Sequence, residues 1–206
     1  MPTADGKCRV GVLALQGSVV EHLDRLKQCG AEAEAVKTLP GLMEVDGLII
    51  PGGESTTMGK LLKAFGLLDP LKKRIREGLP VWGTCAGLIL LAQTVIGGEM
   101  PRPGTMAITV RRNAYGTQLD SFETSGIIPA VSPEPLPLVF IRAPYIEAVG
   151  PEVTVLHQLD GHITAACQDR MLVTAFHPEL TEDCRVHRFF IDRFVTPGSR
   201  KAEGAA

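Results

Sequence analysis

Short apolar runs alternate with longer amphipathic segments through the first half of the chain. This alternation is typical of βαβ units, and it predicts a mostly parallel sheet flanked by helices. The strand candidates are residues 8–15, 33–37, 47–50 and 80–83, and the helix candidates are residues 19–29, 56–64, 69–77 and 86–92.

A capping signal precedes the first helix candidate. Ser18 and Glu21 have the spacing of a capping box, in which the serine hydroxyl accepts from a helix N–H and the glutamate reaches back. Gly30 follows the last helical position and is expected to end the helix. We therefore expect Ser18 to cap this helix.

The helical pattern disappears after Gly97. Glycine, proline and alternating segments such as residues 108–111 predict hairpins laid over the sheet as far as residue 132. Strand candidates follow at residues 138–141, 153–158, 162–167 and 171–176, and a closing helix at residues 183–195. We expect a single α/β domain over residues 1–206, with an ordered core at about 8–195 and a flexible tail at 196–206.

The composition is that of an ordinary globular protein. With 206 residues, the chain can bury roughly 70% of its unfolded surface. Hydrophobic residues make up 45% and charged residues 21%, which excludes a disordered or fibrous chain. The formal net charge of −2 provides no field that would attract nucleic acid or anionic lipid, so we expect neither nucleic acid nor membrane as a partner.

The cysteines form neither a disulfide framework nor a zinc site. They are odd in number, scattered, and contain no C-x-x-C pair. The N-terminal segment lacks the apolar stretch of a signal peptide, and no run approaches the ~18 apolar residues of a membrane span. We expect a reduced, cytoplasmic protein without a bound metal.

Cys85 lies in the sequence Gly-Thr-Cys-Ala-Gly, where a strand candidate turns into a helix candidate. This is the spacing of a nucleophile elbow with cysteine in place of serine. A helix N-terminus favours the thiolate, which is the nucleophilic form. On this pentapeptide alone, a small buried packing residue explains Cys85 equally well.

His177, Pro178 and Glu179 follow the last strand candidate. If that strand is parallel to the one before Cys85, both segments reach the same carboxyl edge of the sheet. Proline favours extended backbone at His177, and residues i and i+2 of an extended segment point to one side. Glu179 could then orient the imidazole, although a solvated surface turn is the alternative.

A glycine-containing loop, residues 51–55, follows the third strand candidate. Its two glycines allow backbone N–H groups to approach a reacting oxygen, and Gly53 together with Ala86 is the candidate oxyanion hole. The loop lacks the G-x-x-x-x-G-K-[ST] pattern of a phosphate site.

The remaining histidines and cysteines are expected to have structural or surface roles. They show neither metal-ligand spacing nor a partner in an evident turn. They are His22, His157, His162, His187, Cys8, Cys29, Cys167 and Cys184.

The cysteine elbow, the Gly-Gly loop and the His-Pro-Glu turn occur in the order found in class I glutamine amidotransferases. Over about residues 9–195 the chain resembles this family, and more narrowly the family of glutaminase subunits of pyridoxal 5′-phosphate synthases. The motifs are LALQG and EH (13–17, 21–22), PGGESTTMGKLL (51–62), GTCAGLILLA (83–92), RNAYG (112–116), DSFE (120–123), FIRAP (140–144) and TAFHPEL (174–180). Thr117 departs from the family pattern, which commonly has Arg there, and this bears on contacts around that segment.

The resemblance implies a flavodoxin-like three-layer sandwich and a catalytic triad of Cys85, His177 and Glu179. Cys85 would attack the side-chain amide of L-glutamine, His177 would protonate the departing ammonia, and water would hydrolyse the glutamyl thioester. No cofactor is implied. The glutamine-binding positions match Gly53, Glu54, Ser55, Arg112, Ile141 and Arg142. On the sequence alone, Arg112 beside Arg111 is also explained as one of two solvated charges.

The resemblance also implies a partner. Glutaminases of this family supply ammonia to a separate synthase subunit, which builds pyridoxal 5′-phosphate. We therefore expect a hetero-oligomer in which the synthase subunit activates this chain and receives ammonia through an internal channel. Gln16 is a hypothetical link between docking and the oxyanion hole.

Two other functions fit the same scaffold. One is a glutaminase or γ-glutamyl hydrolase that serves another pathway, against which the DSFE and FIRAP motifs count. The other is a binding or regulatory module without catalysis, against which the complete set of Cys85, His177 and Glu179 counts.

Overall fold

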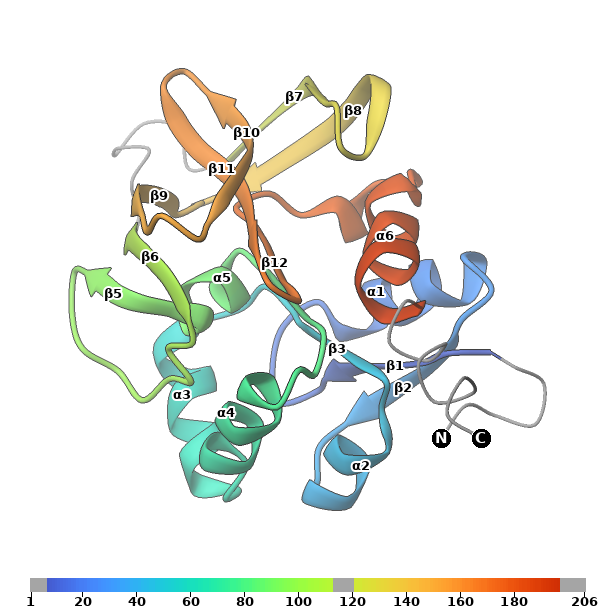
Figure 1. The fold of residues 1–206 in the computed structure, drawn as a ribbon, viewed down its shortest axis with the longest axis vertical. Helices are drawn as coiled ribbons and strands as arrows, with labels where there is room; N and C mark the ends of the chain where they lie inside the picture. Colours follow the sequence, from blue (N-terminus) through green and yellow to red (C-terminus); the bar gives the residue numbers. More distant parts are fainter. Residues whose placement is uncertain (1–6, 113–120, 197–206) are drawn as a thin grey trace.

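A ten-stranded sheet forms the centre of the molecule (Figure 1). The computed structural model describes residues 7–112 and 121–196. Five neighbouring strands are parallel, in the order β2-β1-β3-β4-β12, which is the order of a flavodoxin-like sheet. The predicted α/β class is confirmed. The five strands are β1 (Arg9–Leu13), β2 (Glu32–Val36), β3 (Gly47–Ile50), β4 (Val81–Thr84) and β12 (Met171–Thr174).

Helices cover both faces of the parallel strands (Figure 1). Helix α1 packs against α6, and α3 packs against α4 and α5. Side chains alternate between the two faces of a strand, so β3 contacts one group of helices on each face of the sheet. A Cβ at Gly47 would lie 2.7 Å from Val195, whereas a Cβ at Gly87 of α5 would lie 3.1 Å from the Cβ of Ile50. The helices are α1 (Val19–Gln28), α3 (Ser55–Ala64), α4 (Leu68–Arg76), α5 (Ala86–Leu91) and α6 (Arg185–Phe190).

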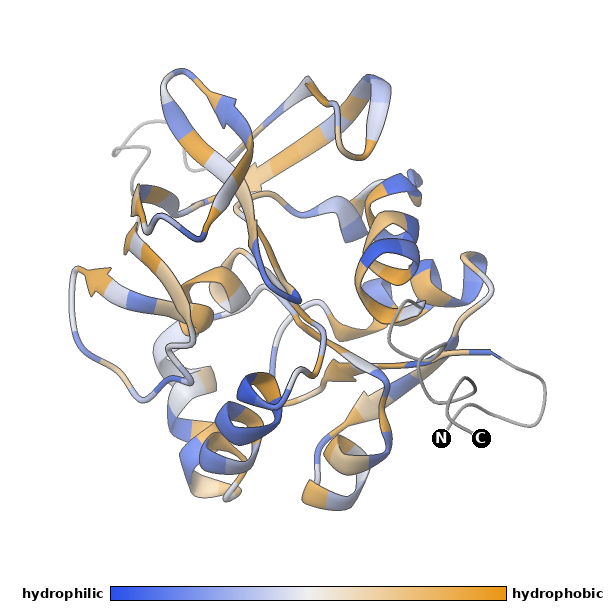
Figure 2. Ribbon diagram, viewed as in Figure 1, coloured by the Kyte–Doolittle hydropathy of each residue, from blue (hydrophilic) through white to orange (hydrophobic). Residues whose placement is uncertain are grey.

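The core lies between these layers. Every residue of β3, β4 and β12 is buried, and Figure 2 shows apolar residues concentrated along the central strands. Burying one large apolar side chain contributes about 1.5–3 kcal/mol, so the strands that end at the candidate site are among the most firmly placed. Trp82, the one tryptophan of the chain, is fully buried in β4.

An antiparallel extension continues the sheet beyond β12. It runs β11-β9-β6-β5, and β10 pairs with β11. A separate two-stranded sheet, β7-β8, is a hairpin whose first strand lies in the segment predicted to form hairpins and whose second strand continues beyond it. These strands are β5 (Ala92–Ile96), β6 (Met106–Arg111), β7 (Ser121–Ile128), β8 (Ser132–Ile141), β9 (Tyr145–Val149), β10 (Thr154–Leu159) and β11 (His162–Gln168).

Several element predictions were wrong or incomplete. Strand β8 begins at Ser132, whereas the prediction began at residue 138. The prediction missed the first part of the strand because that part contains three prolines, which lower strand propensity. Strands β5 and β9 and the short helix α2 (Leu39–Glu44) were not predicted. The closing helix is divided into α6 and a π-helical turn, η2 (Ile191–Val195). Within the described ranges, no helix has the length and apolarity needed to cross a membrane.

Candidate active site

Cys85 occupies a sharp turn between β4 and α5. Its backbone has φ 47° and ψ −98°, a region that costs a non-glycine residue about 1–3 kcal/mol. Gly83 permits the turn, because a Cβ there would lie 2.5 Å from the carbonyl carbon of Gly87. The strained elbow places Cys85 at the carboxyl edge of the sheet and at the start of a helix.

His177 reaches the same edge from the neighbouring strand. Strand β12 is parallel to β4, with Thr174 paired to Thr84, and the backbone N–H of Cys85 donates to the Thr174 carbonyl at 2.8 Å. The N–H of His177 in turn donates to the carbonyl of Val139 in β8 at 2.8 Å. The backbone therefore fixes His177 close to Cys85.

The predicted extended geometry after His177 is wrong. Residues Pro178–Leu180 form a 3₁₀ turn, η1, with proline at a first-turn position, where its fixed φ and missing N–H are tolerated. The turn still brings the two side chains together, with His177 Nδ1 2.8 Å from Oε1 of Glu179.

Partners on both sides of His177 set its protonation. Burial alone would lower the pKa of His177, but interactions with Cys85 and then Glu179 raise this pKa to about 10. A histidine that stays protonated between a thiol and a carboxylate is suited to give a proton to a leaving group.

Glu179 is almost fully buried behind His177. Burial alone would raise the pKa of Glu179, but His22, His177 and Ser18 lower this pKa to about 2. The hydroxyl of Ser18 donates to Oε1 of Glu179 at 2.6 Å and makes no helix-capping bond. The expectation that Ser18 caps α1 was therefore wrong, because the buried carboxylate is the stronger acceptor.

The structure also brings His22 next to Glu179. From the sequence, His22 was expected to have only a structural or surface role. His22 in α1 is fully buried, and its Nε2 lies 3.5 Å from Oε2 of Glu179. The sequence signal for His22 was its place in the EH motif, but nothing in its local pattern pointed to Glu179.

A pocket of about 460 Å³ opens above Cys85. It gathers every predicted site residue except Glu179, which stands behind His177. Gln16, Gly17, Ser18 and Leu180, none of which was predicted as a substrate contact, also line it. The predicted residues in its wall are Gly53, Glu54, Ser55, Cys85, Ala86, Arg112, Ile141, Arg142 and His177.

Glu54 organises the part of the pocket wall at the start of α3. Its carboxylate caps α3 by accepting from the N–H groups of Thr56 and Thr57, and it lies 3.4 Å from Nη2 of Arg112. Burial alone would raise the pKa of Glu54, but the hydrogen bonds from Thr57 and Thr56 lower it to about 2. The N–H of Glu54 donates to Gln16 Oε1 at 2.9 Å, which connects the segment after β1 to the Gly-Gly loop.

The Gly-Gly loop passes directly beside the imidazole. A Cβ at Gly52 would lie 2.3 Å from Cε1 of His177, so no larger residue fits there while His177 keeps its place. Gly53 and Ala86 both line the pocket. Backbone N–H groups in such a position can face an oxyanion formed above Cys85.

The end of β8 closes the pocket. The Cys85 thiol contacts the Ile141 carbonyl at 3.9 Å, and Arg142 follows with a positive φ of 43°. The segment from residue 113 to 120, which carries Thr117 and most of the RNAYG motif, lies outside the described residues. The polar tail beyond residue 196 also lies outside them.

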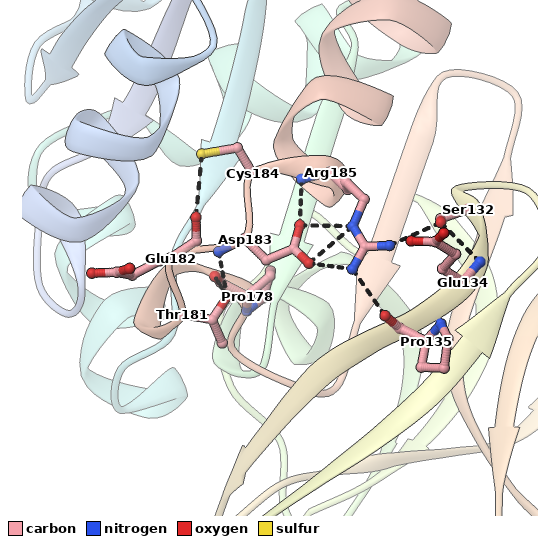
Figure 3. A network of polar contacts seen from close by, with 9 residues as sticks. All are labelled: Ser132, Glu134, Pro135, Pro178, Thr181, Glu182, Asp183, Cys184 and Arg185. Atoms are coloured by element: carbon pink, nitrogen blue, oxygen red, sulfur yellow. Dashed lines mark hydrogen bonds and ion pairs between the residues drawn. The ribbon is translucent and has the colours of Figure 1, made fainter.

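A polar network anchors the turn that carries Glu179 (Figure 3). Arg185 binds the Asp183 carboxylate with two nitrogens and donates to Ser132 Oγ at 2.9 Å and to the Pro135 carbonyl at 2.9 Å. Thr181 donates to the Pro178 carbonyl at 3.0 Å. These contacts tie η1 and the start of α6 to β8.

The chain is similar to known glutamine amidotransferases. The family model of the SNO glutamine amidotransferase family matches residues 12–196. Two similar curated proteins, from Carboxydothermus hydrogenoformans and Clostridium botulinum, are both named pyridoxal 5′-phosphate synthase subunit PdxT. The first is 54% identical over 90% of this chain and 97% of its own length, and the second is 54% identical over 91% and 97%.

The chain is also similar to a solved structure of a glutamine amidotransferase. The crystal structure of a glutamine amidotransferase is 45% identical in sequence and superposes with a TM-score of 0.85, covering 89% of this chain and 97% of that chain. A putative GMP synthase protein from Thermoplasma acidophilum is 16% identical and has a TM-score of 0.69, over 96% and 98% of the two chains, which is a likeness of fold alone.

Proposed function

Because this chain belongs to the SNO glutamine amidotransferase family, we propose that it is the glutaminase subunit of a pyridoxal 5′-phosphate synthase. It hydrolyses L-glutamine to L-glutamate and ammonia, and it passes the ammonia to a separate synthase subunit. The observation that carries the proposal is the buried His177–Glu179 pair, whose imidazole lines the same pocket as Cys85.

The first half-reaction is the formation of a thioester. The Cys85 thiolate attacks the side-chain carbonyl carbon of glutamine, and backbone N–H groups at Gly53 and Ala86 stabilise the oxyanion. Protonated His177 then donates its proton to the amide nitrogen. The C–N bond breaks, and ammonia leaves.

The second half-reaction regenerates the enzyme. Neutral His177 takes a proton from a water molecule, which attacks the thioester carbonyl. The C–S bond breaks, glutamate leaves, and the Cys85 thiolate and the protonated His177 are restored. Glu179 keeps the imidazole oriented and stabilises its charge throughout.

Charged groups at the pocket rim suit the other end of the substrate. Arg112 presents a guanidinium that can bind the α-carboxylate of glutamine, while Glu54 lies close enough to bind its α-ammonium group. Ser55 and the Ile141–Arg142 segment complete the binding site. Such anchoring places the amide carbonyl over the thiolate.

The ammonia is the useful product. The curated relatives are named as subunits of a synthase, and we infer the same arrangement here, with a synthase subunit that activates the glutaminase and receives ammonia through a channel. Gln16 connects β1 to Glu54 and is our proposed link between docking and the oxyanion loop. The reaction takes place in the cytoplasm, where Cys85 stays reduced.

Ammonia release from glutamine tests this proposal. We expect the wild-type protein to release ammonia when a pyridoxal 5′-phosphate synthase subunit is present, and the Cys85→Ala variant to release none. Cys167→Ala is the matched control, because this free cysteine lies in β11, outside the pocket. Activity of Cys85→Ala would overturn the mechanism, and a rate unaffected by the synthase subunit would overturn the assigned partner.

A further inference from the structure

We propose that His22, supported by His187, is a positioning residue that anchors the second carboxylate oxygen of Glu179. The two histidines form a buried chain that starts at the triad and ends between α1 and α6. This inference rests on the proposed roles of Cys85, His177 and Glu179.

The chain of contacts is continuous. Oε1 of Glu179 accepts from Ser18 at 2.6 Å and lies 2.8 Å from Nδ1 of His177. Oε2 has no other hydrogen-bond partner within the described part of the chain, and Nε2 of His22 lies 3.5 Å from it, at the long limit of a hydrogen bond. Nδ1 of His22 is 3.0 Å from Nε2 of His187.

The carboxylate determines which nitrogen of each ring carries the proton. An ionised carboxylate can only accept, so the stable tautomer of His22 has its proton on Nε2, facing Glu179 Oε2 and Thr84 Oγ1, which lies 3.3 Å away. Nδ1 of neutral His22 is then an acceptor, and Nε2 of His187 must donate to it. Nδ1 of His187, which has no partner among the described residues, is left as an acceptor and not as an unpaired donor.

The surroundings keep both rings neutral and in place. Both histidines are fully buried, and the ring of Trp82 meets them edge to face, with centroids 5.6 Å from His22 and 4.9 Å from His187. Burial lowers the pKa of both histidines. Four ionisable groups face the pair of histidines. Two, Glu179 and His177, belong to the site, and two, Glu21 and Arg25, belong to α1.

The consequence is that His22 helps to hold the Glu179 carboxylate in a fixed position. Glu179 is a buried charge, and such a charge stays ionised and stationary only while dipoles surround it. Oε2 has no other hydrogen-bond partner among the described residues, so without the His22 N–H 3.5 Å away it would lose a nearby donor. Glu179 would then hold the His177 ring less firmly, which slows proton transfer without weakening the binding of glutamine.

Two substitutions at His22 separate this role from simple packing. His22→Leu removes the donor, whereas His22→Gln can place an amide N–H near the position of Nε2. In the complex with the synthase subunit, we expect His22→Leu to lower kcat about tenfold or more with KM for glutamine changed by less than about twofold. We expect His22→Gln to recover most of the loss. The matched control is His157→Gln, since His157 lies in β10 outside the pocket and bonds to Thr164.

The results distinguish the hypotheses. Unchanged kcat in His22→Leu, or equal loss in the Leu and Gln variants, would overturn the positioning role. Cys85→Ala is measured alongside: if it stays active, the proposed function fails, and if it is inactive while His22→Leu is fully active, only this inference fails.

A spectroscopic measurement on the wild-type protein covers the case in which the variants do not fold. In protein labelled with ¹⁵N-histidine, the ring nitrogen shifts report the tautomer directly. We expect His22 and His187 both to be neutral at pH 7 with the proton on Nε2. A protonated ring, or a proton on Nδ1 of His22, would overturn the proposal.

Discussion

The backbone N–H of Cys85 donates a hydrogen bond of 2.8 Å to the carbonyl of Thr174. This one contact joins the end of the strand that carries the candidate nucleophile to the end of the strand that delivers His177. The distance between the candidate nucleophile and its candidate base is therefore set by the ladder between two buried parallel strands, β4 and β12. A site built on such strands is held more precisely than one built on loops.

The protonation of His177 is expected to depend on Cys85. Interaction with Cys85 contributes to the raised pKa of about 10, so Cys85→Ala should lower the pKa of His177. NMR titration of the imidazole in both proteins measures this change. The same pKa in both would show that Cys85 does not interact with His177.

The same shift has a consequence for stability. The pKa of His177 in the folded protein lies above the ordinary value of 6.5, so protonation favours the folded state. This contribution is fully present below pH 6.5 and is lost as the pH rises through about 10. Urea unfolding at several pH values should show a smaller decrease over this window for Cys85→Ala than for the wild type, and identical decreases would contradict the linkage.

Removal of the Ser18 hydroxyl should weaken the proposed triad at Glu179. Ser18→Ala leaves the buried Glu179 carboxylate without its 2.6 Å donor, so we expect a loss of about 1–3 kcal/mol in the free energy of unfolding. We also expect a lower kcat. Thr38→Ala is the control, because Thr38 caps α2 away from the pocket and its loss should cost about 1 kcal/mol with activity unchanged. A Ser18→Ala variant with wild-type kcat would show that this donor is dispensable.

The Gly-Gly loop should not tolerate a side chain at Gly52. A Cβ there would lie 2.3 Å from the His177 ring, so Gly52→Ala should displace the imidazole and lower kcat at least about 100-fold. Gly41→Ala provides the comparison, because the nearest atoms to a Cβ at Gly41 are 3.6 Å away. That variant should be as active as the wild type, and comparable kcat values for the two variants would rule out the steric explanation.

Arg112 and Arg111 are expected to differ in their effect on substrate binding. Arg112 lines the pocket, whereas Arg111 forms an exposed ion pair with Glu147 at 2.6 Å. Steady-state kinetics should show KM for glutamine raised at least about tenfold by Arg112→Ala and changed by less than about twofold by Arg111→Ala. Equal effects would remove Arg112 from the substrate site.

The parallel half of the fold could be predicted from sequence because its signals are local. Strands β1, β3 and β4 are short apolar runs followed by glycine turns or helices, and the chemistry-bearing residues stand immediately after the strands. A shared edge for Cys85 and His177 was expected only if the last strand was parallel to the strand before Cys85, and the parallel pairing of β12 with β4 meets that condition.

The antiparallel half depends on distant pairing, which leaves a weak local signal. Strand β5 continues directly from α5 without a turn residue, so the apolar run at Leu91 and Ala92 gave no sign of the change. Three prolines concealed the first part of β8.

The contacts of Ser18 and His22 that support the proposed triad could not be predicted from sequence for the same reason. Ser18 and Glu179 are 161 residues apart, and His22 and His187 are 165 residues apart. Ser18 had a satisfactory local role as a helix cap, and only the packing of α1 against η1 and α6 shows that its hydroxyl bonds elsewhere. Contacts of this kind come from tertiary structure and not from any pattern in a short segment.

The covalent intermediate is the most direct test of the proposed mechanism. The protein is mixed with glutamine and the synthase subunit, quenched in acid during turnover, and mapped by mass spectrometry of its peptides. We expect one glutamyl group on the peptide that contains Cys85, and none in the Cys85→Ala variant. A glutamyl group on another residue, or ammonia released by Cys85→Ala, would contradict the assignment of Cys85 as the nucleophile.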